Sequence, residues 1–399
     1  MTPAARIQTA IEILDRILAG AAAEQVLTQW ARASRFAGSG DRAAVRDHVF
    51  DALRRLRSMT AVGGGAAPSG RAVMLGVVKT AGADPASVFA GAGHGPMPLS
   101  DAECAALGAA PALQDLAAPV ALDFPDWLET PLRLSLGPNL EAVMKAFQCR
   151  APTFLRVHAR RAERAVVRAD LAREGIVTLP ADSSRHALVV VENERKISRS
   201  AAYCSGLIEL QDISPQTAVE ELPLRPGMRV LDYCAGGGGK SLAMAARVDA
   251  DYAAHDIAPA RMRDLAVRAR RARAAIRQVA APALKAEAPF DLVLADVPCS
   301  GSGTWRRQPQ AKWTLTAEQL TELCRMQAAI LDAAAGHVGM GGDLVYMTCS
   351  LLRCENEDQI QAFLRRHPHW LLVRETRFGP ATGGDGFFSA LLTRRQEGR

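Results

Sequence analysis

The sequence predicts an α/β fold with a parallel, doubly wound sheet in its C-terminal half, preceded by an all-helical region and a small α+β module. From about Arg225, short apolar runs alternate with segments of helical periodicity, which is typical of parallel strands joined by crossover helices. Before residue 135, apolar residues recur at helical spacing. We therefore expect three domains, covering residues 1–135, 136–205 and 206–399.

Helices are expected throughout the first domain. Apolar residues from Ile7 to Leu18 fall on one face of a first helix, and further helices are expected over 44–59, 71–88 and 101–107. Five arginines lie along the other side of the second helix: Arg42, Arg46, Arg54, Arg55 and Arg57. They form either a solvated face or a face that contacts phosphates, and charge alone leaves both interpretations open.

The remaining elements are expected in two groups. The small module has strands over 154–158 and 186–192, with a helix over 162–174 between them. The C-terminal domain has strands over 229–233, 252–255, 290–295 and 344–347, and helices over 240–247, 259–273, 316–335 and 355–366. In such a sheet, the ligand crevice lies at the carboxyl ends of the strands.

Composition restricts the class of protein. The chain has 399 residues, of which 49% are hydrophobic, so a substantial core is available. No apolar run is long enough to span a membrane, and the N-terminus lacks the order of a signal peptide. We therefore expect a cytoplasmic protein without membrane association. The net charge of +6 is compatible with a nucleic-acid partner, but a GC-rich genome that favours arginine explains it equally well.

The eight cysteines give no sign of a metal site. They form no CxxC pair, and no Cys/His spacing resembles a zinc site, so we expect no metal and reduced thiols. Four of them are expected to be small buried residues: Cys104, Cys149, Cys204 and Cys324.

Two other cysteines, Cys299 and Cys349, each closely follow an apolar run that is typical of a buried strand. Because both would lie at the carboxyl ends of strands, we expect both thiols in one crevice. A thiolate is a strong nucleophile where its surroundings lower its pKa. With the acid Asp296 nearby, the pair predicts covalent chemistry, although either cysteine alone is more simply explained as a small buried residue.

A glycine-rich turn between a strand and a helix indicates a cofactor site. It comprises Cys234, Ala235, Gly236, Gly237, Gly238, Gly239 and Lys240. A Walker A loop needs a glycine where this chain has Cys234, and a dinucleotide site usually has GxGxxG. A ligand without phosphates, such as S-adenosylmethionine, fits the turn better than a nucleoside triphosphate or a dinucleotide does. The alternative is a structural turn that binds no ligand.

Asp256 follows the next strand. It is placed to bind ribose hydroxyls or to cap the helix that Pro259 opens.

Together these motifs resemble those of the Sun-type (NOL/NOP/Sun) RNA cytosine-5 methyltransferases. The resemblance covers about 205–399 and includes four further segments: Leu210-Gln-Asp212, Arg306-Arg-Gln-Pro-Gln-Ala-Lys-Trp313, Glu355-Asn-Glu357 and Asp385-Gly-Phe-Phe388. The small module resembles the family's RNA-binding insert. The helical N-terminus, residues 1–135, is similar to the NusB-like RNA-binding domain of the bacterial 16S rRNA members, the RsmB type.

The resemblance implies a Rossmann-like, S-adenosyl-L-methionine-dependent methyltransferase domain and an RNA partner, small-subunit ribosomal RNA in the RsmB-type members. No obligate protein partner is evident. By this resemblance, Cys349 attacks C6 of the target cytosine and makes C5 nucleophilic, and Cys299 helps to release the product. Asp296 would orient the cofactor or the base, and Lys240 would contact the target nucleotide or the cofactor. The target base must leave its stack to reach the thiol.

Two features depart from the family's usual pattern. Gly-Gly-Gly-Gly-Lys replaces Ala-Pro-Gly-Gly-Lys in the loop, and the segment 278–282 lacks the Asp that commonly bonds the adenine amino group. One hydrogen bond is worth roughly 0.5–1.5 kcal/mol, so we expect cofactor affinity to fall by up to about tenfold.

These departures define the main alternative, a non-catalytic RNA-binding ribosome-assembly factor with a degenerate cofactor site. The presence of both cysteines, Asp256 and Asp296 argues against it. A DNA methyltransferase would leave Thr-Cys-Ser without a role, and a dehydrogenase would require a loop that suits a pyrophosphate.

Overall fold

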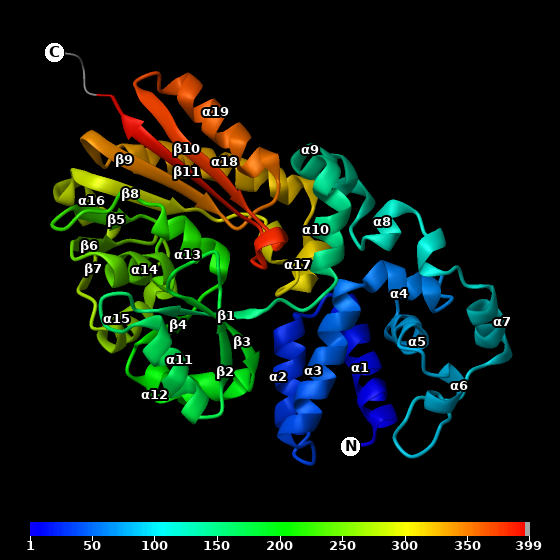
Figure 1. Cartoon of the computed structure of the whole chain (residues 1–399). Helices are drawn as coiled ribbons and strands as arrows, with labels where there is room; N and C mark the ends of the chain where they lie inside the picture. Colours follow the sequence, from blue (N-terminus) through cyan, green and yellow to red (C-terminus); the bar gives the residue numbers. More distant parts are fainter. Residues whose placement is uncertain (396–399) are drawn as a thin grey trace. The chain divides into compact units, whose positions relative to one another are not determined.

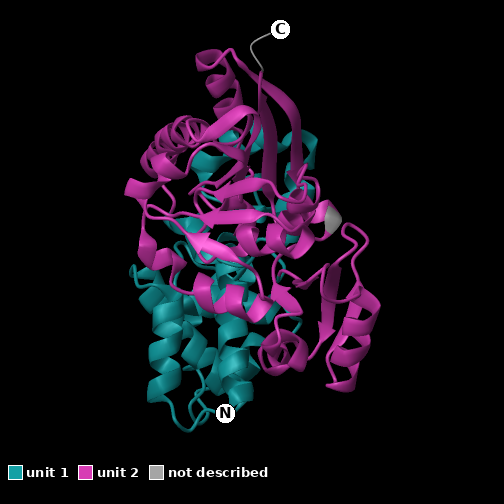
Figure 2. Ribbon diagram, turned by 90° about the vertical axis from the view of Figure 1, so that its left-hand side faces the viewer, with its two compact units in different colours: residues 1–150, 305–314 teal, residues 151–304, 315–399 magenta. Residues whose placement is uncertain are grey.

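The computed structural model describes residues 1–395. Contacts divide the chain into two units, which we call the helical unit (Met1–Arg150 and Trp305–Thr314) and the sheet unit (Ala151–Thr304 and Leu315–Arg399) (Figure 2). The helical unit thus includes a short segment from the C-terminal half of the sequence, which the sequence pattern did not predict. The division into three domains at 135 and 205 stays a prediction.

The helical unit is built around α1, α2, α3 and α5, which surround an apolar core (Figure 1). Leu14, Val49 and Val73 are fully buried in this core. Its α-helices are α1 (Pro3–Leu18), α2 (Ala23–Ala33), α3 (Ser39–Arg54), α4 (Leu56–Val62), α5 (Gly70–Thr80), α6 (Pro85–Val88), α7 (Asp101–Ala109), α8 (Ala118–Ala121), α9 (Glu129–Leu136), α10 (Leu140–Phe147) and α17 (Pro309–Thr314). The side chain of Thr2 caps α1 by accepting a hydrogen bond from the backbone N–H of Ala5.

The single helix expected over 44–59 is wrong, because the chain breaks at Arg55, whose φ of −120° and ψ of 37° are not helical. The arginine face expected there is also wrong for Arg54, which is buried. Its Nε donates to the carbonyl oxygen of Arg306 at 2.7 Å and its Nη1 donates to Asp51 at 2.5 Å. Arg42 and Arg46 do lie exposed on α3.

Side chains of the segment Trp305–Thr314 make hydrogen bonds to the backbone of α2 and α3. Trp313 Nε1 donates to the carbonyl oxygen of Leu53 at 2.7 Å. Gln310 Oε1 accepts from the N–H of Ala23, where α2 begins, and Gln310 Nε2 donates to the carbonyl oxygen of Ala21, both at 2.8 Å. These bonds satisfy polar backbone groups at the start of α2 that have no partner within the helix.

The sheet unit contains a four-stranded antiparallel sheet in the order β2-β3-β1-β4. Its strands are β1 (Thr153–Val157), β2 (Val177–Pro180), β3 (Ala187–Glu192) and β4 (Ile208–Leu210). The helices α11 (Arg164–Arg173) and α12 (Ala201–Cys204) pack on it through a core that includes Leu171 and Leu188. The sequence predicted β1, β3 and α11 but not β2, which is short and ends in proline, a residue that removes a backbone donor.

A seven-stranded sheet in the order β10-β11-β9-β8-β5-β6-β7 forms the rest of the sheet unit. Its strands are β5 (Arg229–Asp232), β6 (Asp251–Ala254), β7 (Ile276–Gln278), β8 (Phe290–Asp296), β9 (Val338–Thr348), β10 (Trp370–Phe378) and β11 (Phe387–Arg394). Its helices are α13 (Ile213–Glu220), α14 (Gly239–Arg247), α15 (Leu265–Ala272), α16 (Ala281–Glu287), α18 (Ala317–Ala335) and α19 (Glu357–Arg366). Figure 1 shows helices on both faces of this sheet. The predicted α/β, Rossmann-like class is therefore confirmed.

The expectation of a wholly parallel sheet is corrected at one edge. Strands β5 to β9 pair in parallel, but β11 runs antiparallel to β9 and β10 runs antiparallel to β11. The chain leaves β5 first toward β6 and β7 and then returns to β8 on the other side. The strand order thus reverses between β5 and β8, and this switch point is where α/β sheets bind ligands.

The expectation of four small buried cysteines is wrong for Cys104, Cys149 and Cys204, which are exposed, and Cys324 is half-buried. Cys104 lies on α7, a helix without any buried residue, and Cys149 follows the end of α10. Cysteine type alone therefore did not indicate burial in these short peripheral helices.

None of the helices in the described part of the chain combines the length and the apolar character that crossing a bilayer requires. That part also contains no group of histidine, cysteine and acidic residues arranged to hold a metal ion.

Candidate active site

Loops that follow β5, β8 and β9 converge at the switch point of the large sheet. β5 ends at Asp232, β8 at Asp296 and β9 at Thr348. The N–H of Val297 donates to the carbonyl oxygen of Met347 at 3.0 Å, which ties the start of the second loop to the end of β9. The structure thus brings together the residues that the sequence placed at strand ends.

The two thiols lie side by side, with the Sγ atoms of Cys299 and Cys349 3.3 Å apart. The backbone holds this arrangement, since the N–H of Gly303 donates to the carbonyl oxygen of Cys349 at 2.9 Å. Gly303 in turn packs so closely on Gly386 that a Cβ there would lie 1.9 Å from the Gly386 carbonyl oxygen. Only glycine fits at position 303 without displacing the loop.

The thiol pair has opposed acidities. The hydrogen bond between the two thiols, helped by the nearby Lys240 ammonium, lowers the pKa of Cys349 below its ordinary value despite burial. The same hydrogen bond, together with burial, raises the pKa of Cys299 well above its ordinary value. Cys349 is therefore the more acidic thiol of the pair.

Lys240 reaches the thiol pair from the first turn of α14. Its Nζ lies 2.5 Å from Asp296 Oδ2, and it lies 5.1 Å from the ring centre of Phe387. Burial alone would lower the pKa of Lys240, but the Asp296 carboxylate outweighs burial and raises it. Lys240 is thus a fixed ammonium beside Cys349 and Asp296.

The buried carboxylate of Glu355 forms hydrogen bonds to both of the loops that carry Cys299 and Cys349. Its Oε1 accepts from the N–H of Ser300 at 2.7 Å and from Gln327 Nε2 at 3.0 Å. Its Oε2 accepts from the hydroxyls of Ser300 and Ser350. Each of these serines directly follows one of the two cysteines, so one side chain sets the position of both thiols.

This network was not predicted as such. The repeated Cys-Ser dipeptide, Cys299-Ser300 and Cys349-Ser350, was the signal in the sequence that could have indicated it. Gln327 on α18 carried no comparable signal, because nothing in its helix distinguishes it from an exposed glutamine.

Two segments that lie far apart in the sequence are joined at the edge of the site. Asp212 Oδ1 accepts from the N–H groups of Ser214 and Asp385, both at 3.0 Å. The Ser214 hydroxyl donates to the carbonyl oxygen of Asp385 at 2.7 Å. Gln211 Nε2 donates to the carbonyl oxygen of Gly239 at 3.3 Å. The segments 210–212 and 385–388 therefore support the glycine loop and the Gly303 contact.

The glycine loop and Asp256 form one hydrogen-bonded unit. Gly236 and Gly238 have φ values of 50° and 81°, in the left-handed region that favours glycine. Asp256 Oδ2 accepts from the N–H of Gly236 at 3.0 Å, and Oδ1 accepts from the N–H of Ala258 at 2.9 Å. The bond to Gly236 links the acid to the loop, and Arg261 Nη1 lies 3.4 Å from Oδ2. The capping alternative is wrong, because Ala258 is the N-cap of the helical turn that begins at Pro259 and no side chain caps it.

Acidic and basic side chains both border the loop. Burial, together with the charges of Asp232, Asp256 and Asp296, raises the pKa of Cys234 to about 12. Asp232 is buried, accepts from Ser241 through Oδ2 and has no partner for Oδ1 in the described structure. Burial raises its pKa to about 7. Asp296 is paired with Lys240 and Asp256 with Arg261, so two of these three acids have a cationic partner.

The end of β7 confirms the departure noted in the sequence. After Gln278 the chain continues into Val279, whose carbonyl oxygen lies 3.0 Å from His255 Nδ1, and Ala280, which precedes α16 without a side-chain cap. No carboxylate is present in the segment 278–282.

The comparisons with known proteins identify the family. Residues 219–393 match the family described as 16S rRNA methyltransferase RsmB/F, and residues 124–198 match the ferredoxin-like domain of RsmF/B-like methyltransferases. The ribosomal RNA small subunit methyltransferase B of Xylella fastidiosa (strain 9a5c) is 33% identical over 67% of this chain and 68% of its own length. The chain belongs to the RsmB/F family of 16S rRNA methyltransferases. The suspected resemblance is thereby confirmed.

Other RsmB/F relatives are matched over slightly less of their length. Ribosomal RNA small subunit methyltransferase B of Xanthomonas campestris pv. campestris is 34% identical over 67% of this chain and 66% of its own length. The namesake from Vibrio cholerae is 31% identical over 68% of this chain and 65% of its own length. The chain therefore spans about two thirds of these relatives. S-adenosyl-L-methionine, the cofactor predicted from the sequence, follows from membership of this methyltransferase family.

Solved structures support the fold. The crystal structure of PH0851 aligns with 98% of this chain and 99% of its own, with a TM-score of 0.74 and 22% identity. NSun6 from Pyrococcus horikoshii aligns with 69% of this chain and 99% of its own, with a TM-score of 0.61 and 18% identity. At this level of identity, the likeness shows that the RsmB/F chain shares their fold.

Proposed function

We propose that this chain methylates C5 of a cytosine in RNA, with 16S ribosomal RNA as substrate, through a covalent adduct between Cys349 and C6 of the base. The observation that carries the proposal is the pair of thiols 3.3 Å apart beside the Lys240–Asp296 ion pair. A single buried cysteine would need neither an S–H donor nor a neighbouring ammonium.

The first step uses Cys349 as the nucleophile. Its thiolate, stabilised by the S–H of Cys299 and by Lys240, forms a bond to C6 of the flipped cytosine. The electron pair of the C5–C6 double bond then moves into the C4–C5 bond and the C4–N3 double-bond pair moves to N3, so C5 becomes the nucleophilic carbon of an enamine. Asp296, held by Lys240, is placed to orient the base or the cofactor at this stage.

S-adenosylmethionine supplies an electrophilic methyl group when it is bound. The loop residues 234–239 and the carboxylates of Asp232, Asp256 and Asp296 are the groups of this chain that would hold it. Asp256 would accept from the ribose hydroxyls, and Asp232 and Asp296 would face the positive end of the ligand. The loop backbone approaches closely because its glycines carry no side chain.

Product release breaks the bond between Cys349 and C6 that the first step formed. After methyl transfer, a water molecule takes the C5 proton, the C5–H electron pair restores the C5–C6 double bond, and the C6–S bond breaks. Cys349 leaves as a thiolate, and the Cys299 S–H stands 3.3 Å away to donate a hydrogen bond to it. Cys299 thus lowers the barrier to release by stabilising the leaving sulfur.

Two cysteine variants test the assignment. With labelled RNA and cofactor, Cys349→Ala is expected to abolish methylation and form no adduct, while Cys299→Ala is expected to accumulate protein covalently bound to RNA on denaturing gels. Cys149→Ala, which changes an exposed thiol, is the matched control and should behave like the wild type. An adduct that survives Cys349→Ala would reverse the roles of the two thiols.

The substrate needs its own measurement. Bisulfite sequencing of 16S ribosomal RNA from a deletion strain is expected to show one cytosine that has lost its protection, and complementation with Cys349→Ala should not restore it. An unchanged 16S pattern would move the proposal to another RNA.

The missing carboxylate after β7 favours one competing function, an RNA-binding assembly factor without catalysis. A methyl-transfer assay on unmodified 16S ribosomal RNA separates the two. Transfer that depends on Cys349 supports the enzyme, whereas RNA binding with no transfer at saturating cofactor supports the assembly factor.

A further inference from the structure

The glycine loop of the candidate active site is held from outside by an arginine on α15. Arg268 Nη1 donates a hydrogen bond to the carbonyl oxygen of Gly237. The same peptide group is held at its other end, because the N–H of Gly238 donates to the carbonyl oxygen of Ala235 at 2.8 Å. Since a peptide group is planar, these two bonds together fix its orientation in the loop.

The guanidinium of Arg268 also fills the space beside Gly237. A Cβ at position 237 would lie 3.1 Å from Nη1 of Arg268. Gly237 stands where the family's usual loop pattern has proline. Proline fixes φ, whereas glycine has the largest backbone freedom to lose, so the loop of this chain lacks an internal restraint at this position. Arg268 restrains the loop through a side-chain contact in its place.

A buried carboxylate on β4 orients Arg268. Glu209 is buried, and its Oε2 lies 3.1 Å from Nη2 of Arg268. Its Oε1 accepts from Arg271, which lies nearly one turn further along α15. A planar guanidinium that bonds a carboxylate through one nitrogen and a carbonyl oxygen through another has few alternative positions. Glu209 therefore directs Arg268 onto the loop.

A second side chain from the same segment supports the loop directly. Glu209 and Gln211 are two residues apart in extended chain, so their side chains lie on the same face. Gln211 Nε2 donates to the carbonyl oxygen of Gly239 at 3.3 Å. The segment at β4 thus holds two carbonyl groups of the glycine loop, Gly237 through Arg268 and Gly239 through Gln211.

We propose that Arg268 is a positioning residue for S-adenosylmethionine, because it keeps the loop 234–239 in the conformation that binds the cofactor. A loop that is ordered before its ligand arrives loses less conformational entropy on binding. The contact therefore raises the affinity for the cofactor and takes no part in methyl transfer itself. The inference depends on the cofactor site and not on the identity of the target base.

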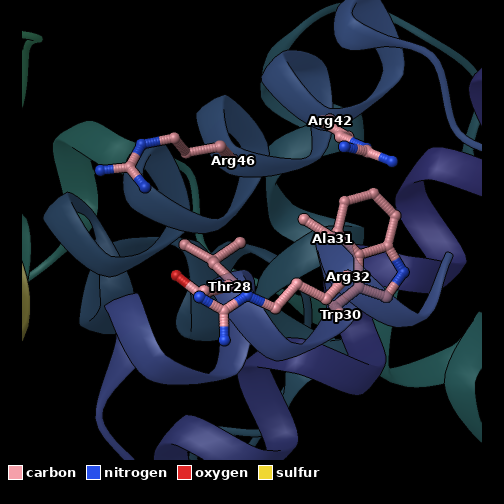
Figure 3. Close-up of a pocket in the computed structure, with 7 residues that line it drawn as sticks. Thr28, Trp30, Ala31, Arg32, Arg42 and Arg46 are labelled. Carbon is pink, nitrogen blue, oxygen red and sulfur yellow. The ribbon is translucent and has the colours of Figure 1, made fainter. Parts of the chain in front are cut away.

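Isothermal titration calorimetry of the full chain with S-adenosylmethionine, without RNA, tests the inference. We expect Arg268→Gln to raise the Kd about tenfold, the scale of one hydrogen bond from a charged donor. Arg268→Lys keeps a cationic donor and should recover part of the affinity. Two controls remove the same charge elsewhere and should keep the wild-type Kd. Arg270→Gln changes an exposed position on α15, and Arg32→Gln changes an arginine that lines the pocket of the helical unit shown in Figure 3.

A double-mutant cycle with Gly237→Ala tests the contact itself. In the wild-type background, the new Cβ presses on Nη1 of Arg268 and should raise the Kd about threefold or more. In the Arg268→Gln background, the shorter side chain leaves room, so Gly237→Ala should change the Kd by less than about twofold. Equal factors in the two backgrounds would show that Arg268 does not restrain the loop.

The kinetics separate positioning from a loss of stability. In Arg268→Gln, the KM for the cofactor is expected to rise while kcat at saturating cofactor stays within about twofold, which a smaller folded fraction would not produce. An unchanged Kd in Arg268→Gln, an equal loss in Arg270→Gln, or a wild type that binds no S-adenosylmethionine would overturn the inference. A wild type that binds the cofactor but methylates no RNA would overturn the proposed function only, and the calorimetric result for Arg268 would stand.

Discussion

The Sγ atoms of Cys299 and Cys349 lie 3.3 Å apart, and the hydrogen bond between them lowers the pKa of Cys349. Replacing Cys299 by alanine removes the donor, so the pKa of Cys349 should rise. The rate of alkylation of Cys349 by iodoacetamide should then reach half its maximum at a higher pH than in the wild type. The measurement is made with Cys104, Cys149 and Cys204 replaced by serine, because these exposed thiols would react first. A half-point that stays in place or moves to lower pH would contradict the donor role.

Loss of the Lys240–Asp296 ion pair is expected to slow methyl transfer and not only to lower the stability of the fold. Lys240→Met removes the ammonium that favours the Cys349 thiolate and leaves Asp296 without its partner. We expect the single-turnover rate of methyl transfer to fall on the order of 100-fold, the scale of a lost charged group in an active site. Lys240→Arg keeps the charge and should recover part of the rate. A lower melting temperature with an unchanged single-turnover rate would show that the pair is only structural.

Strand ends were the part of the site that the sequence predicted best. Cys299, Cys349 and Asp296 follow long apolar runs, and parallel strands bring their carboxyl ends to one edge whatever the loops do. The position of Lys240 followed from the strand–turn–helix pattern of the glycine loop. The sequence did not indicate the distance between the two thiols. That distance depends on the hydrogen bonds of Glu355 and on the close contact of Gly303 with Gly386.

The missed features share one physical cause, since they depend on contacts between residues far apart in the sequence. Trp313 has no apolar partner near it in sequence, and its indole bonds to Leu53. β10 is an edge strand, and β11 lies between β10 and β9, so the place of both depends on pairing with β9, which precedes them in the sequence. Leu56 is buried as its helical periodicity predicted, whereas the burial of Met59, after the break at Arg55, was not predicted.

Gly303→Ala tests the contact that holds the second cysteine loop. The new Cβ would lie 1.9 Å from the carbonyl oxygen of Gly386, so one of the two segments must move. We expect the free energy of unfolding to fall by about 2 kcal/mol or more, as for overpacked sites, and adduct formation to slow. Gly40→Ala on α3, where a Cβ would meet nothing within 4 Å, is the control and should raise stability by up to about 1 kcal/mol. Normal activity and stability in Gly303→Ala would show that the loop is adaptable.

Ala280→Asp is expected to tighten cofactor binding. Ala280 precedes α16, is exposed and provides no side-chain cap. An aspartate there would restore a carboxylate after β7 and would also cap α16, worth about 1 kcal/mol of stability. Calorimetry with S-adenosylmethionine should show a Kd lower by up to about tenfold, the scale of one hydrogen bond. Ala280→Asn caps the helix without adding a charge, so an equal gain in the Asn variant would assign the effect to the helix and not to a contact with adenine.

Lys312 predicts a stability that increases with pH. It is 1% exposed, and burial, with the charge of Arg54 in addition, lowers its pKa to about 8, against the opposing influence of Asp123. Between pH 8 and the ordinary lysine value, the unfolded chain binds a proton that the folded chain does not, so stability rises with pH across this window by up to about 3 kcal/mol. Lys312→Met cannot titrate, and its melting temperature should lack this rise. The difference in melting temperature between the two proteins, measured by calorimetry from pH 7 to 10, is the test. A constant difference across that range would mean that Lys312 keeps its charge through its bond to the Arg54 carbonyl oxygen.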